Sequence, residues 1–133
     1  MSTKPHIIEF SKTGEPGIGY LSIAETGKSI PFEIRRAFWA YYTPDSILRG
    51  RHAHHKTEMV LVAVAGRIVV TTETAEHGVN VFTLEEPNKG LYLPAYCWHT
   101  MQYSHNAVQL VLASTDYDEK DYIRDYELFK KNV

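Results

Sequence analysis

The stretch RGRHAHHKTEMVLVAVAGRIVV, Arg49 to Val70, joins a cluster of histidines to two runs of apolar and β-branched residues. Three histidines fall within four positions here, at His52, His54 and His55. Histidine clusters occur in metal sites, in acid–base sites and in solvated loops. The rest of the sequence is needed to choose among these three kinds of site.

Short apolar segments separated by turn signals run through most of the chain, which is typical of strands. Eight segments fit: residues 6–10, 19–25, 35–42, 58–66, 67–73, 79–84, 90–94 and 107–114. Many short strands at this spacing predict an all-β fold, a sandwich or a small barrel. We expect Gly66 to turn one hairpin and residues 75–80 the next. Residues 118–133 instead carry a helical apolar stripe with early acids and late lysines, which predicts a short C-terminal helix.

Composition indicates one globular domain spanning residues 1–133. The chain is 44% apolar and 23% charged, with a formal net charge of -2, and its length supports one sizeable core. It has no basic stripe for nucleic acid, no apolar run long enough for a membrane span and no signal-peptide pattern at its start. We expect neither nucleic acid nor membrane as a partner. Cys97 is the only cysteine, which suits a cytoplasmic location.

His52 and His54 are two residues apart, so on an extended strand their side chains leave the same face. Glu58 has the same parity, and His99 lies in a second stretch, GLYLPAYCWHT, residues 90–100. Together the stretches read H-x-H-x3-E and G-x3-P-x4-H, which resembles the two motifs of the cupin superfamily. In metal-binding cupins such residues hold one divalent ion, and imidazole with carboxylate would suit Fe, Mn, Ni or Zn.

Three further segments indicate one family within the cupin superfamily: IPFEIRRAFWAYYTP (30–44), GLYLPAYCWHTMQYS (90–104) and LASTDYDEKDYIRDYELF (112–129). With the R-G-x-H-A-H stretch, and in the same order, they resemble the WxcM-like nucleotide-sugar 3,4-ketoisomerases, a cupin-fold family. The resemblance implies a cupin-like jelly-roll β-barrel or β-sandwich, a homodimer, and no metal or other cofactor. It also implies a dTDP-linked 4-keto-6-deoxyhexose as substrate and a product used for 3-amino-3,6-dideoxy sugars of surface polysaccharides.

In this reading the histidines transfer protons while the keto group moves from C4 to C3. Histidine has an ordinary pKa of about 6.5, so it can act as a base at neutral pH. We expect His52 to be the base at carbon, His54 its partner at oxygen, and His99 to act at C4 in forming a galacto product. The residues expected to bind the substrate are Arg49, Arg36, Tyr20, Phe38, Trp39, Tyr41 and Tyr103.

The chain departs from the family where Ile18-Gly19-Tyr20-Leu21 stands in place of R-G-N-L, which leaves the sugar contacts open. Tyr117, Tyr122 and Arg124 belong to the resembling tail, but they fit the packing of the C-terminal segment equally well. Two other functions stay open. One is a metal-dependent cupin enzyme using His52, His54, Glu58 and His99, and the other is a non-catalytic sugar-nucleotide binding module.

Overall fold

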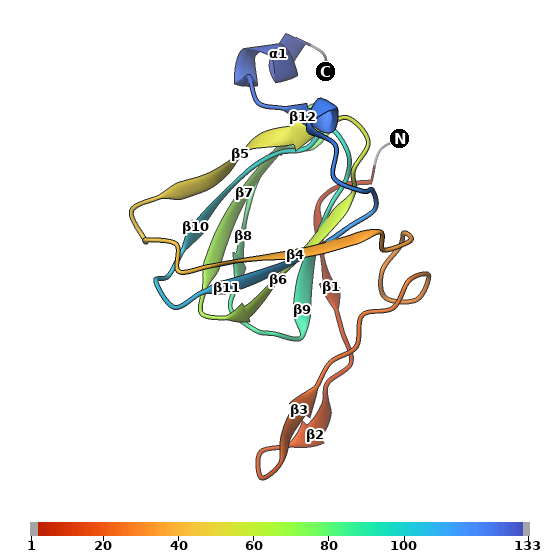
Figure 1. Cartoon of the computed structure of the whole chain (residues 1–133), viewed down its shortest axis with the longest axis vertical. Coiled ribbons are helices and arrows are strands. Elements are labelled where there is room, and N and C mark those ends of the chain that lie inside the picture. Colours follow the sequence, from red (N-terminus) through yellow and green to blue (C-terminus); the bar gives the residue numbers. More distant parts are fainter. Residues whose placement is uncertain (1–2, 132–133) are drawn as a thin grey trace.

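A computed structural model describes residues 3–131, and its centre is a sandwich of two five-stranded antiparallel sheets (Figure 1). The strands are β1 His6–Glu9, β2 Thr13–Glu15, β3 Gly19–Leu21, β4 Arg36–Tyr41, β5 Leu48–His54, β6 Met59–Ala65, β7 Ile68–Thr74, β8 Gly78–Leu84, β9 Lys89–Leu93, β10 Trp98–Tyr103, β11 Val108–Ala113 and β12 Tyr122–Ile123. One sheet has the order β1-β9-β6-β11-β4 and the other β12-β5-β10-β7-β8.

The strand pairs are nested around the β7–β8 hairpin. β7 pairs with β8, β6 with β9, β5 with β10, and β4 with β11. This nesting is the jelly-roll arrangement. The cupin-like β-sandwich prediction is therefore confirmed, whereas a closed barrel is not formed, because the two sheets keep separate edge strands. No helix within residues 3–131 is long and apolar enough to cross a membrane.

Alternation along β6 explains why this strand is buried on both faces. Met59, Leu61 and Ala63 belong to the core shared by the two sheets. Val60 and Val62 belong to a second cluster, formed with residues of the N-terminal segment such as Phe32. From Met59 to Ala63 neither face is left to water, so a continuous apolar sequence is required there, whereas Val64 and Ala65 at the end of the strand are exposed.

Two local predictions need correction. Gly66 lies between β6 and β7, but these strands belong to different sheets, so the turn links the two layers and makes no hairpin. The C-terminal helix is shorter than expected: α1 spans Tyr126–Lys131, and a 3-10 turn, Glu119–Asp121, precedes it. Between them β12 extends β5's sheet, because Tyr122 pairs with His54 and Ile123 with Ala53. Residues 132–133 of the predicted helix lie outside the described residues.

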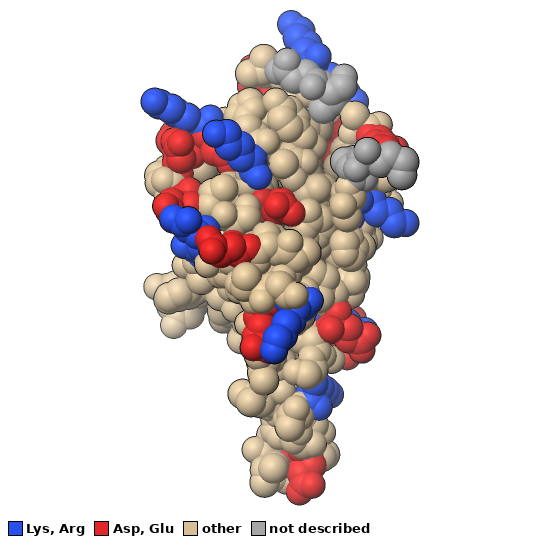
Figure 2. All heavy atoms as spheres, turned by 90° about the vertical axis from the view of Figure 1, so that its right-hand side faces the viewer, with Lys and Arg blue, Asp and Glu red and all other residues tan. Residues whose placement is uncertain are grey.

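The β2–β3 hairpin projects from the sandwich as a separate arm (Figure 1). Its side chains are exposed, including Ile18 (80%), Tyr20 (51%) and Leu21 (61%). The face drawn in Figure 2 shows acidic and basic side chains interspersed, without a continuous basic stripe. The arm thus holds apolar side chains that the rest of this chain leaves uncovered.

Candidate active site

Three imidazole rings meet on the inner face of the second sheet. His52 and His54 come from β5, and His99 lies directly opposite His52 on β10. The centroid of the His52 ring lies 5.0 Å from that of His54 and 4.7 Å from that of His99. The centroids of the His54 and His99 rings lie 6.0 Å apart. His54 and His99 are buried. The fold therefore brings together the three residues predicted to be catalytic.

Backbone carbonyls fix the ring orientation of two of these histidines. His52 Nδ1 lies 3.0 Å from the Gly50 carbonyl oxygen, and His99 Nδ1 lies 3.0 Å from that of Cys97. Because a carbonyl oxygen only accepts, each Nδ1 carries the proton and each Nε2 keeps its lone pair. The Nε2 atom of His54 is buried without a hydrogen-bond partner among residues 3–131. Such an atom is available for a ligand.

Burial keeps all three rings uncharged at neutral pH. It lowers the pKa of His52 and His54 to about 4 and that of His99 to about 3. The second cause of each lowered pKa is electrostatic: a neighbouring histidine of the cluster disfavours a positive charge on the ring. Neutral imidazoles can remove protons, so the cluster suits general-base chemistry.

A pocket of about 610 Å³ opens over the three rings. The aromatic wall expected from the sequence is present, and the pocket residues expected to bind substrate are Phe38, Trp39, Tyr41, Arg49 and Tyr103. Tyr103 donates from its hydroxyl to Gln109 Oε1 at 2.5 Å. Burial raises the pKa of Tyr103 to about 12, against the effect of Arg49. Tyr103 therefore stays protonated, and Gln109 joins the pocket as a polar residue that the sequence did not single out.

Two other residues expected to bind substrate lie elsewhere. Tyr20 lines a separate cavity of about 550 Å³ on the outer face of the first sheet, because the β2–β3 arm directs it there. Arg36 does not line the histidine pocket. Its guanidinium carbon lies over the rings of Phe38 and Tyr117, 5.2 and 5.7 Å from their centroids.

Glu58 also lies away from the histidines, so the prediction that it shares their face is wrong. Its carboxylate accepts a hydrogen bond of 2.6 Å from the Tyr92 hydroxyl, and Tyr92 belongs to the cluster under the N-terminal segment. The parity count fails because the chain crosses from one sheet to the other between His54 and Met59. Within residues 3–131 no group of three or more His, Cys, Asp or Glu side chains could hold a metal ion. The four-ligand metal site suggested by the motif is thus not assembled.

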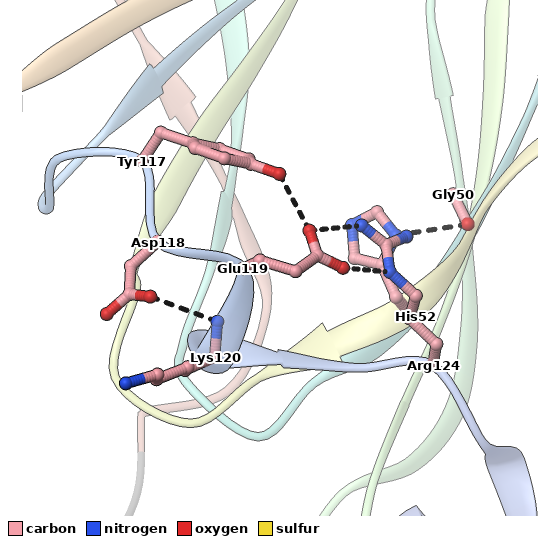
Figure 3. Close-up of polar contacts among 7 residues, drawn as sticks. All are labelled: Gly50, His52, Tyr117, Asp118, Glu119, Lys120 and Arg124. Carbon is pink, nitrogen blue, oxygen red and sulfur yellow. Dashed lines mark hydrogen bonds and ion pairs between the residues drawn. The ribbon is translucent and has the colours of Figure 1, made fainter.

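The C-terminal segment supplies one wall of the pocket, which the sequence left undecided. The Tyr122 ring lies 5.0 Å from His52 and 4.4 Å from His54, centroid to centroid. Arg124 covers Tyr122, with its guanidinium carbon 4.4 Å from the ring centroid. Glu119 accepts two hydrogen bonds from Arg124, at 2.8 and 3.1 Å, beside the His52–Gly50 contact (Figure 3). Both Tyr122 and Arg124 line the pocket.

Comparison with known proteins agrees with this geometry. The family model described as "FdtA: WxcM-like, C-terminal" matches residues 3–133. The chain belongs to this WxcM-like family. A TDP-4-oxo-6-deoxy-alpha-D-glucose-3,4-oxoisomerase from Aneurinibacillus thermoaerophilus is 41% identical over 116 residues, which are 86% of this chain and 83% of that protein.

Two solved structures show the same fold over nearly the full length of this WxcM-like protein. A 3,4-ketoisomerase from Helicobacter canadensis is 34% identical, with a TM-score of 0.92 and 98% of each chain covered. A mutant of the 3,4-ketoisomerase QdtA from Thermoanaerobacterium thermosaccharolyticum, in complex with TDP-4-keto-6-deoxyglucose, is 30% identical. Its TM-score is 0.92, and the match covers 99% of this chain and 95% of that one.

Proposed function

We propose that this protein is a nucleotide-sugar 3,4-ketoisomerase that converts TDP-4-keto-6-deoxyglucose to a TDP-3-keto-6-deoxyhexose. The observation that carries the proposal is the cluster of three neutral imidazoles at the base of an open pocket. The 41% identical oxoisomerase and the ketoisomerase with TDP-4-keto-6-deoxyglucose support the choice of reaction and substrate.

The chemistry needs proton transfers and no external oxidant. The C4 ketone acidifies the hydrogen on C3, and His52 Nε2 removes that proton to give an enediolate. His54 moves the proton of the C3 hydroxyl to the C4 oxygen. The proton that His52 Nε2 took from C3, after exchange with solvent, is then returned to C4, which becomes the new hydroxyl-bearing carbon. C3 is thereby oxidised and C4 reduced within one molecule, so two well-placed bases supply what the reaction requires.

Product configuration depends on the face from which C4 receives its proton. His99 stands beside His52 on the neighbouring strand and is buried. We assign to His99 a role on the face that gives an axial hydroxyl, and hence the galacto product, TDP-3-keto-6-deoxygalactose. Such a product would feed synthesis of 3-amino-3,6-dideoxy sugars for surface polysaccharides, in the cytoplasm.

A homodimer is also part of this proposal. The β2–β3 arm exposes Ile18, Tyr20 and Leu21, and exposed apolar surface of this kind favours association. Exposed edge strands are commonly covered by a second copy of the same chain. Light scattering at working concentration should give twice the mass of the chain, and a monomeric mass would count against the dimer.

Incubation of the purified protein with TDP-4-keto-6-deoxyglucose separates an enzyme from a binding module. The enzyme must form a 3-keto product, whereas a binding module returns the substrate unchanged. Metal analysis of the same sample addresses the metal-dependent alternative, because that enzyme requires a stoichiometric ion.

A further inference from the structure

Strand β5 is irregular just before the first catalytic histidine. Gly50 and Arg51 have φ angles of 84° and 61°, in the left-handed region that side chains other than glycine rarely adopt. On β10, His99 is paired with His52 and the next residue, Thr100, with Gly50. Arg51 therefore has no cross-strand partner on β10. This is a β-bulge, one extra residue inserted into one strand of a pair.

The bulge changes which side chains enter the pocket. In a regular strand, residues three apart such as Arg49 and His52 point to opposite faces. Here Arg49 is paired with Met101 and His52 with His99, and cross-strand partners share a face. Met101 and His99 both line the pocket, as do Arg49 and His52. The extra residue thus places Arg49 on the same face as the catalytic histidines.

The same bulge orients the base. Gly50 presents its carbonyl oxygen to His52 Nδ1 at 3.0 Å (Figure 3), which leaves Nε2 for the substrate. A Cβ on Gly50 would lie 2.8 Å from the His99 carbonyl oxygen and 3.1 Å from the end of the Met101 side chain. The backbone of the two strands is therefore too close for any residue but glycine at this position.

Arg51 is exposed, and its side chain has no hydrogen bond or ion pair with residues 3–131. We propose that the Gly50–Arg51 bulge is a positioning device, which holds His52 with Nε2 toward the substrate and turns Arg49 into the same pocket. This inference rests on the proposed ketoisomerase function.

Substitutions that differ in their tolerance of a left-handed φ test the proposal. Glycine and asparagine adopt this conformation most readily, alanine less so, and β-branched valine least. We expect Arg51→Gly and Arg51→Asn to keep kcat within about threefold of the wild type, although both remove the charge. Arg51→Val should lower kcat at least tenfold and also raise KM, because Arg49 leaves the pocket. The kcat of Arg51→Ala should lie between those of the asparagine and valine variants. This variant replaces Arg51→Val in the test if the valine variant does not fold.

The tautomer of His52 provides a second measurement, because a bulge with a purely structural role would leave it unchanged. In ¹⁵N NMR spectra the wild type and the asparagine variant should show the proton on Nδ1, whereas the valine variant should show a mixture of tautomers. Gln102→Val is the matched control, since it places valine at an exposed position in the regular part of neighbouring β10. This control should leave both kcat and the tautomer unchanged.

Wild-type kcat and tautomer in Arg51→Val and Arg51→Ala would overturn the proposal. An asparagine variant as inactive as the valine variant would do so too, because the charge would then matter. Failure of the wild type to convert TDP-4-keto-6-deoxyglucose would instead refute the ketoisomerase function. The tautomer measurement would still report on the bulge in that case.

Discussion

His52 and His99 face each other across β5 and β10, with ring centroids 4.7 Å apart and each Nδ1 tied to a backbone carbonyl. Both rings therefore offer Nε2 as a proton acceptor in one pocket. This pairing joins the two histidine stretches of the sequence into one site.

Loss of the base at carbon should stop the reaction. We expect His52→Asn to lower kcat about 10²- to 10⁴-fold, the usual contribution of a positioned general base. Asparagine has a similar shape but cannot accept a proton at neutral pH, so the circular dichroism spectrum should be unchanged. Turnover within severalfold of the wild type would remove His52 from the proposed role.

The pH dependence of kcat/KM should reflect bases with depressed pKa values. Burial lowers the pKa of His52 and His54 to about 4, so both rings stay neutral well below pH 6.5. Activity should therefore be constant from neutral pH down to about pH 5 and fall only as the rings become protonated below it. An acidic limb near 6.5, the ordinary histidine value, would contradict the buried, neutral cluster.

The free energy of unfolding should also depend on the protonation of these three histidines, but over a different pH range from that of the activity. In the unfolded chain these histidines titrate near 6.5, and in the folded protein near 4 or below. Between these values the unfolded state binds more protons, so the free energy of unfolding should decrease as pH falls from about 6.5 to 4. Urea unfolding at several pH values measures this. A free energy of unfolding that is constant or higher at pH 5 than at pH 7 would be inconsistent with it.

Arg124 should influence the bases through its charge. It lowers the pKa of both His52 and His54, whereas its partner Glu119 raises that of His52. Arg124→Gln removes the cation and leaves the carboxylate, so the acidic limb of kcat/KM should move to higher pH. Arg124→Lys keeps the charge and is the matched control, with a smaller shift. A limb that stays in place or moves to lower pH in the glutamine variant would show that Arg124 does not act in this way.

A substitution of Glu58 distinguishes the ketoisomerase from the metal-dependent cupin enzyme. Its carboxylate is hydrogen-bonded to Tyr92 on the outer side of the first sheet, so Glu58→Gln should keep activity within about twofold while retaining a hydrogen bond. A four-ligand metal enzyme would lose activity with this variant. EDTA should also leave turnover unchanged, and activity restored only by added Fe, Mn, Ni or Zn would favour the alternative.

Strand periodicity alone is enough to predict the shared face of His52 and His54, because the bulge at Gly50–Arg51 precedes both residues on β5. The same counting misplaced Glu58, since parity is meaningful only within one strand and the chain changes sheets before β6. Arg49 reached the pocket for a reason that counting could not supply, namely the extra residue at Arg51.

The C-terminal wall of the site was the hardest feature to anticipate. Residues 118–133 carry a helical pattern, but Tyr122 instead pairs with His54 as a short strand. Long-range pairing overrides local periodicity in such cases. Only the likeness of the tail to the family pointed to Tyr122 and Arg124, and that likeness did not say whether they pack or bind.

Proton NMR of the product that the purified wild-type protein makes from TDP-4-keto-6-deoxyglucose shows directly whether the keto group moves from C4 to C3. The proposed mechanism predicts a TDP-3-keto-6-deoxyhexose, with solvent deuterium at the carbon that receives the proton and an axial C4 hydroxyl. An equatorial hydroxyl would contradict the role given to His99. Unchanged substrate, or a product still carrying its ketone at C4, would contradict the ketoisomerase itself.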